Sequence, residues 1–206
     1  MTKTFTPIQQ EVLIELFNEG VNCCSNDLAA MINDAEVIVS TPLPRTTSIH
    51  KILSHKSSSD LRVSVSSLSG GICGDVFVTY PYEEMVPIYF ELQRKESTKS
   101  SMAAREPVFL QEISEMLTAS FLDSMTKSLN LPPVKSSTRA FMSVKEASEN
   151  LNLPNDEENR YCLCARVSLS DADKSVIFYV LFNEQSLFLA QELTRFMKAM
   201  LRPAAV

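Results

Sequence analysis

The fold is decided by the stretch EVLIELFNEGVN, residues 11–22. At the rotation of an α-helix, about 100° per residue, the side chains of Glu11, Glu15, Asn18 and Asn22 fall within an arc of about 60°. The opposite side of this helix is apolar and is expected to be buried; it carries Leu13, Leu16, Phe17, Cys24, Leu28 and Met31. The sequence therefore predicts an amphipathic helix that displays a polar stripe, which we define as Glu11, Glu15, Asn18 and Asn22.

Two members of the polar stripe form a chemically useful pair. Glu15 and Asn18 are one helical turn apart, so a carboxylate and a carboxamide can reach the same point in space. The carboxylate can pair with a cation, and the amide can both donate and accept hydrogen bonds. This pair is suited to docking onto a lysine of a partner and positioning a water molecule.

The stripe and a proline further along resemble the signature of the CheC/CheX/FliY family of chemotaxis phosphatases. That signature has Asp or Ser, then Glu, then Asn at the spacing seen here, followed by a more distant proline. Glu11, Glu15 and Asn18 stand at the first three positions, and Pro42 follows Asn18 after 23 residues, one more than is usual. The segments IELFNEG at 14–20 and EVIVSTP at 36–42 carry the resemblance.

Two departures from the signature stay open at this point. Glu11 replaces the Asp or Ser of the family, which puts the role of that position in question. A second register, with Glu19 and Asn22 as the Glu and Asn, also fits the short pattern but leaves only 19 residues before Pro42. The spacing favours the first register.

The resemblance implies a phosphatase that removes the aspartyl phosphate of a CheY-like response regulator. Such a regulator supplies its own lysine and Mg²⁺ beside the acyl phosphate, so we expect no cofactor or metal on this chain. By resemblance, Asn18 orients the attacking water and Glu15 pairs with the lysine of the regulator. Glu11, Asn22 and Pro42 are expected to contact the partner.

A non-catalytic adaptor is the alternative function. Flagellar switch proteins share this fold, so the chain could bind a response regulator, the receptor deamidase CheD or a flagellar switch component without hydrolysis. Glu11 at the Asp/Ser position favours the adaptor, whereas Glu15 and Asn18 favour the enzyme. Phosphate release from a phosphorylated regulator separates the two hypotheses.

The chain gives the same order of elements twice, which indicates a duplicated unit. We expect one CheC-like domain over residues 1–206, built from repeats at 6–95 and 106–201 and joined by a polar linker at 95–105. The first repeat is predicted to hold a helix from Pro7 to about Ile32 capped by Thr6 and Gln9, a strand at 35–41, a connection at 43–60, strands at 61–68 and 73–80, and a helix at 82–94. The second is predicted to hold a helix from Pro107, a strand at 138–143, a connection at 145–159, a hairpin of strands at 161–168 and 175–182 turning at 171–173, and a helix at 184–200.

The predicted fold class is α/β (α+β): a pseudo-twofold, antiparallel-rich sheet with two long helices on one face.

The second long helix carries an altered stripe. Glu15 and Glu112 are 97 residues apart, and the positions matching the polar stripe are Val108, Glu112, Glu115 and Ala119. The family glutamate is present at Glu112, but Glu115 replaces the asparagine. We interpret Glu112 and Glu115 as a vestigial site.

Composition excludes several classes of protein. A net charge of -6 without a basic cluster argues against a nucleic-acid partner. The longest apolar runs are far below the roughly 20 residues of a membrane helix. The first residues lack the hydrophobic run of a signal peptide, so we expect a cytoplasmic protein with no membrane partner.

Cysteine and histidine give no metal signal. None of the five cysteines has the Cys-x-x-Cys spacing of a zinc or redox site. Cys24, Cys162 and Cys164 are predicted to be small core residues. His50 and His55 are spaced poorly for a shared metal and are predicted to be solvated.

Overall fold

The computed structural model describes residues 5–32, 37–39, 43–48, 51, 61–82, 102–151, 160–169, 175–182 and 187–200. The described helices are α1 (Pro7–Ile32), α4 (Met102–Leu129), α5 (Val144–Asn150) and α6 (Leu187–Met200). The strands are β1 (Val37–Val39), β2 (Leu43–Thr47), β3 (Leu61–Gly70), β4 (Gly74–Pro81), β5 (Val134–Phe141), β6 (Arg160–Leu169) and β7 (Ser175–Phe182).

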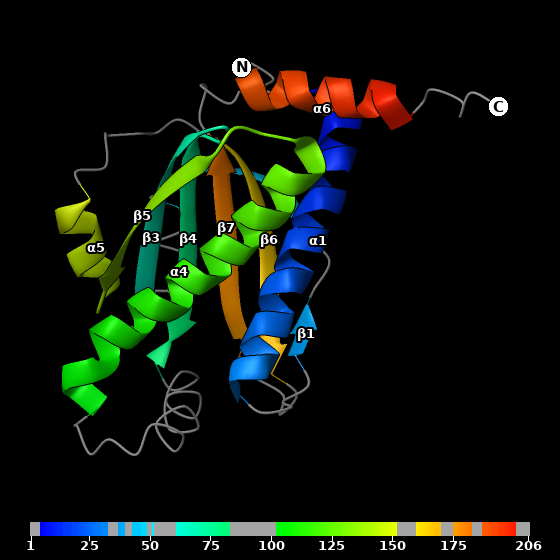
Figure 1. Ribbon diagram of the computed structural model, residues 1–206. Coiled ribbons are helices and arrows are strands. Elements are labelled where there is room, and N and C mark those ends of the chain that lie inside the picture. Colours follow the sequence, from blue (N-terminus) through cyan, green and yellow to red (C-terminus); the bar gives the residue numbers. More distant parts are fainter. Residues whose placement is uncertain are drawn as a thin grey trace.

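The strands form one seven-stranded sheet in the order β1-β6-β7-β4-β3-β5, with β2 also paired to β6. Each of the described pairings is antiparallel. The long helices α1 and α4 cover one face of the sheet, and α6 crosses one end of it (Figure 1). The predicted fold class, an antiparallel sheet with two long helices on one face, is confirmed. Within the described residues, no helix is long and apolar enough to cross a membrane.

The pairing pattern has the predicted pseudo-twofold symmetry. Exchanging the two halves of the chain converts the β3–β4 pair into β6–β7, and the β3–β5 pair into the pairing of β6 with β1 and β2. The β4–β7 pair lies at the centre and maps onto itself. At the edges, β5 pairs only with β3 among the described strands, and β1 and β2 lie along the outer side of β6. The repeat boundaries at 6–95 and 106–201 stay a prediction.

The start of α1 is fixed by the predicted capping box. The backbone N–H of Thr6 donates to Oε1 of Gln9 at 2.7 Å, and the backbone N–H of Gln9 donates to Oγ1 of Thr6 at 3.3 Å. The Gln9 amide also donates to the carbonyl oxygen of Ala190 at 2.8 Å and to Oγ1 of Thr194 at 3.0 Å. The Gln9 side chain therefore caps the N-terminus of α1 and also holds α6 against that end of the helix.

Helices α1 and α4 run antiparallel and approach closely where Gly20 meets Phe121. The rings of Phe17 and Phe121 pack edge to face with centroids 5.3 Å apart. One turn further along, Sγ of Cys24 donates to the carbonyl oxygen of Leu117 at 2.9 Å. Burial raises the pKa of Cys24 to about 12, so this residue stays a thiol and a packing group.

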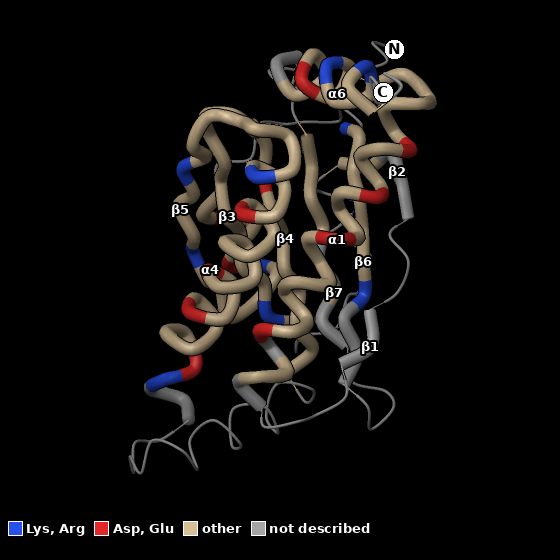
Figure 2. The backbone as a smooth tube through the Cα atoms, turned by 45° about the vertical axis from the view of Figure 1, so that its right-hand side comes forward, with Lys and Arg blue, Asp and Glu red and all other residues tan. Residues whose placement is uncertain are grey.

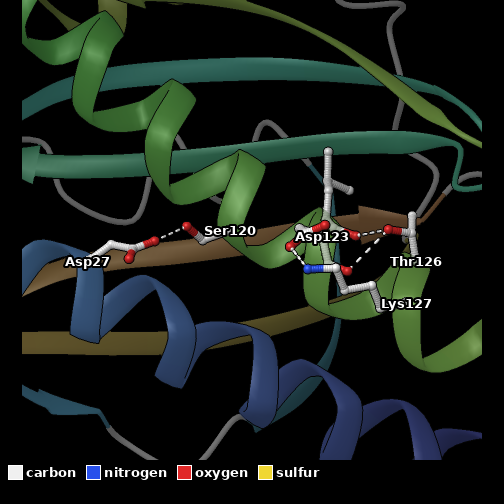
Figure 3. Close-up of polar contacts among 6 residues, drawn as sticks. Asp27, Ser120, Asp123, Thr126 and Lys127 are labelled. Carbon is white, nitrogen blue, oxygen red and sulfur yellow. Dashed lines mark hydrogen bonds and ion pairs between the residues drawn. The ribbon is translucent and has the colours of Figure 1, made fainter.

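The outer rim of the α1–α4 contact is polar. Figure 3 shows Asp27 of α1 pointing toward Ser120 of α4, whose hydroxyl donates to the carboxylate. Lys127 pairs with Asp123 one turn back along α4. Exposed pairs within one helix contribute little stability, so the apolar contacts below this rim hold the two helices together.

A line of buried hydroxyl groups joins α4 to the sheet. Oγ of Ser64 donates to Oγ of Ser114 at 2.5 Å, and the Tyr80 hydroxyl lies 2.6 Å from the same oxygen. Oγ of Ser66 lies 3.2 Å from Oγ1 of Thr118. Because these hydroxyl groups satisfy one another, a serine-rich face of β3 can be buried without an energetic penalty for unpaired polar groups.

The opposite face of β3 is buried as well. The alternation of Leu61, Val63 and Val65 predicts a single buried face, and these three side chains are buried as predicted, in a cluster with Phe141 and Ala147 of β5 and α5. Ser64 and Ser66, on the other face of the strand, contact α4. The prediction missed this second face because isolated serines are usually exposed.

The predicted start of α4 is wrong. Pro107 is favoured at the first position of a helix, but α4 begins at Met102 and contains Pro107. Residues 102–105, assigned to the linker, are helical. Glu106 pairs with the Arg62 guanidinium at 2.6 Å, and this contact fixes the turn before the proline against β3.

Two predicted connections overlap further elements, and strand β5 begins earlier than predicted. Strand β2 lies within 43–60, and α5, which begins at Val144, takes up the first part of 145–159. The N–H of Glu146 donates to Oγ of Ser143 at 3.0 Å, and its carboxylate accepts from the N–H of Met142 at 2.8 Å. This Ser-x-x-Glu cap is a signal that the sequence analysis overlooked. Strand β5 begins at Val134 rather than near 138.

Several predictions lie outside the described residues. They are the helix at 82–94 apart from Tyr82, the linker at 95–101, the hairpin turn at 171–173, both histidines and Pro42.

Candidate functional site

The polar stripe lies on the outer face of α1, away from the sheet. Glu11, Glu15 and Asn22 are exposed and Asn18 is half-buried. The predicted apolar side is buried where it is described, at Leu13, Leu16, Phe17 and Cys24. The predicted amphipathic division of α1 is therefore confirmed over this part of the helix.

The stripe forms one side of a groove of about 790 Å³, which we call the α1–α6 groove. Its α1 side includes the four stripe residues and Glu19, and its α6 side is formed by Phe196 and Met200. The charged residues among its described lining are all acidic. Acidic positions recur along α1 in Figure 2. The groove therefore attracts a cationic partner.

Glu15 and Asn18 are available to such a partner. Within the described part of the chain, neither side chain makes a hydrogen bond or ion pair. Glu19, the glutamate of the alternative register, accepts a hydrogen bond from Oγ of Ser128 at 3.5 Å and is directed toward α4. This difference favours the register with Glu15 and Asn18.

Pro42 lies outside the described residues, so its place relative to the stripe stays a prediction. The structure brings together the other four predicted site residues, Glu11, Glu15, Asn18 and Asn22, along one groove.

The second stripe has the predicted helical register. Each buried position of α1 between 11 and 25 is matched by a buried position of α4 97 residues later. The matched pairs are Leu13 and Leu110, Leu16 and Ile113, Phe17 and Ser114, Gly20 and Leu117, Val21 and Thr118, Cys24 and Phe121, and Ser25 and Leu122. Glu112 and Glu115 are accordingly exposed on the outer face of α4.

The chemistry of this second stripe differs from that of the first. Glu115 accepts a hydrogen bond from the Gln111 amide at 2.9 Å, where the first stripe has the unpaired amide of Asn18. Val108, which is 57% exposed, takes the place of Glu11. The vestigial role assigned to Glu112 and Glu115 stays a prediction.

Comparison with solved structures identifies the fold. Thermotoga maritima FliY is similar with a TM-score of 0.65 at 13% identity, over 97% of this chain and 99% of that one. The FliM middle domain from H. pylori gives 0.65 at 8% identity, over 92% and 99%. The CheX–CheY–BeF3–Mg²⁺ complex from Borrelia burgdorferi contains a chain that gives 0.53 at 12% identity, over 81% and 97%.

The chain has the fold of the CheC/CheX/FliY family. No protein-family profile and no curated protein matches the sequence. The resemblance carried by Glu11, Glu15, Asn18 and Pro42, together with the duplicated order of elements, predicted this fold correctly.

Metal-binding residues are not grouped in the described part of this CheC/CheX/FliY fold. No cluster of three or more His, Cys, Asp or Glu side chains there could hold a metal ion. Cys24 and Cys162 are buried as predicted, and Cys164 is partly exposed.

Sequence reasoning missed the α6 side of the groove. Phe196 and Met200 are spaced i, i+4 and therefore share one face of α6. That spacing is visible in the sequence, but the crossing of α6 over α1 depends on Gln9 and on tertiary packing.

Proposed function

We propose that this protein is a phosphatase that hydrolyses the aspartyl phosphate of a CheY-like response regulator. The observation that carries the proposal is the pair Glu15 and Asn18, one turn apart on an outward face of α1 with no intramolecular partner among the described residues. The fold supports it, since a similar CheX chain was solved together with CheY, BeF3 and Mg²⁺.

In this proposal the chain supplies orientation and the partner supplies charge stabilisation. The Asn18 amide accepts one hydrogen bond from a water molecule and holds it in line with the phosphorus, on the side opposite the aspartyl oxygen. Water attacks phosphorus, the P–O bond to the aspartyl group breaks, and inorganic phosphate and the free carboxylate leave. The lysine and Mg²⁺ of the regulator stabilise the charge of the transferring phosphoryl group, so this chain needs no cofactor of its own.

Glu15 has a separate role in this proposal. Its carboxylate pairs with the regulator lysine and fixes the docking geometry, while Glu11, Asn22 and Pro42 contact the surrounding surface. A helix suits this task because catalytic groups must be held within about 0.5 Å of the productive geometry. The buried contacts of α1 with α4 provide that rigidity.

The experiment measures phosphate release from a regulator phosphorylated with a small acyl phosphate, with and without this protein. We expect the wild-type chain to accelerate release and Asn18→Ala to reduce the acceleration at least about tenfold, or roughly 1.4 kcal/mol. Asn26→Ala is the matched control, since Asn26 is an exposed asparagine of the same helix outside the groove. Equal turnover by Asn18→Ala and Asn26→Ala would contradict the role of Asn18.

A non-catalytic adaptor is the second candidate function. Two observations favour it. The family's Asp or Ser position holds Glu11, and the second stripe has Glu115, which is already hydrogen-bonded, at the position that matches Asn18. The likeness to a FliM middle domain agrees with such a role. Binding of a regulator, CheD or a flagellar switch component without accelerated phosphate release would establish the adaptor in place of the enzyme.

A further inference from the structure

The α6 side of the α1–α6 groove is apolar, whereas the α1 side carries all of the described acidic lining residues beside the apolar side chains of Val12, Ile14 and Leu16. Phe196 is partly buried against the main core, and Met200 is 71% exposed. Both line the groove opposite the stripe. The groove therefore joins a charged wall and an apolar wall that belong to elements far apart in the sequence.

The position of this apolar wall is fixed by the first turns of α6. Leu189 and Leu193 are fully buried, and the Gln9 amide holds Ala190 and Thr194 against the start of α1. The last turn of α6, which carries Met200, is consequently held beside the stripe while its side chain stays exposed.

We propose that Met200, with Phe196 beside it, forms an apolar contact site for the regulator. This site recognises an uncharged patch on the regulator next to the regulator's lysine. This inference rests on the proposed function, since the occupant is the same CheY-like partner. Charge complementarity gives the occupant: the exposed carboxylates of Glu11 and Glu15 attract a cation, and the apolar wall suits an aliphatic or aromatic neighbour of that cation.

The two walls act together on the bound partner. An apolar side chain that closes over the groove excludes water from the Glu15–lysine pair, and a charge pair in a region of lower dielectric constant attracts more strongly. Flexible methionine side chains adapt to such surfaces. Met200 does not reach the reacting atoms in this arrangement, so it adds to binding and leaves the chemical step unchanged.

The test compares steady-state kinetics of regulator dephosphorylation for Met200→Ser, Met200→Lys and Val108→Ser. Met200→Ser is expected to raise KM about fivefold with kcat unchanged, because only apolar contact area is lost. Met200→Lys is expected to raise KM further, since it places a cation opposite the cation of the partner. Val108→Ser removes a side chain of comparable exposure from α4 and is expected to leave both constants unchanged.

A second readout separates this inference from the proposed function. The dissociation constant is measured for the regulator activated with beryllofluoride and Mg²⁺, which stand in for the phosphoryl group. If the wild-type chain binds the regulator but does not accelerate phosphate release, the proposed phosphatase activity is overturned. Weaker binding of the regulator by Met200→Ser would then still support the inference. Four outcomes would each overturn the inference. Met200→Ser could leave KM and Kd unchanged or lower kcat, Val108→Ser could have an equal effect, or the wild-type chain could fail to bind.

Discussion

Gly20 of α1 and Phe121 of α4 meet at the point where the two long helices cross. A Cβ atom on Gly20 would lie 2.8 Å from Cδ2 of Phe121 and 3.3 Å from its carbonyl oxygen. Because Phe121 is fully buried, its ring cannot move aside freely. The close approach of the helices therefore depends on the missing side chain at position 20.

Gly20→Ala is expected to destabilise the protein by about 1 kcal/mol. Alanine improves helix propensity by up to about 1 kcal/mol, but overpacking a core contact costs about 1–3 kcal/mol, so the steric term dominates. Urea unfolding followed by far-UV circular dichroism measures the difference. Phe121→Leu replaces the ring with a smaller side chain and should reduce the cost of Gly20→Ala in a double-mutant cycle. An equal cost of Gly20→Ala in both backgrounds would contradict the contact.

Ser114→Ala is expected to destabilise the protein by about 1–3 kcal/mol, because it leaves the buried hydroxyls of Tyr80 and Ser64 without their acceptor. Ser148→Ala is the matched control. Both serines donate to the carbonyl oxygen four residues back, at 2.6 Å for Ser114 and 2.9 Å for Ser148, but Ser148 is exposed. Equal unfolding midpoints for the two variants would show that the buried hydroxyl line adds no stability.

Glu15→Ala is expected to weaken regulator binding, and the loss should shrink as ionic strength rises, because salt screens the attraction between carboxylate and lysine. Titration at low and high salt measures this. Glu149→Ala controls for the change in net charge, since Glu149 is an exposed carboxylate on α5. Binding that responds identically to both substitutions would count against a docking contact at Glu15.

The second stripe is expected to contribute little to turnover. Glu112→Ala should leave phosphate release nearly unaltered, because the neighbouring Glu115 carboxylate cannot donate a hydrogen bond when ionised and would repel a phosphoryl group. Glu115→Asn restores the amide and is expected to create weak additional activity in a chain carrying Asn18→Ala. If Glu112→Ala silenced the protein while Glu15→Ala did not, the working and vestigial sites would be exchanged.

The buried face of α1 could be predicted from the sequence because it depends on helical periodicity, which is local. The duplicated order of elements likewise predicted the central strands and the equivalence of Glu15 and Glu112. Strand β2 was missed because its sequence, LPRTT, contains a proline and no run of β-branched apolar residues. It is a strand because β6 lies beside it, which is a tertiary effect.

The candidate site could be predicted only in part for the same reason. The stripe lies within one helix, so Glu11, Glu15, Asn18 and Asn22 could be grouped from their spacing. Met200 is 185 residues from Glu15, and only the packing of α6 on Gln9 brings it to the groove.

The edge position of β5 has a consequence for how copies of the chain meet one another. A free strand edge offers unpaired backbone groups to any other edge and is a common start of aggregation. Strand β5 carries Lys135 and Arg139 exposed on one face, so two copies that paired through this strand would bring like charges together. At the far edge, Pro44 in β2 has no N–H to offer. Like charges at one edge of the described sheet and a missing N–H donor at the other therefore both disfavour edge-to-edge pairing of two copies.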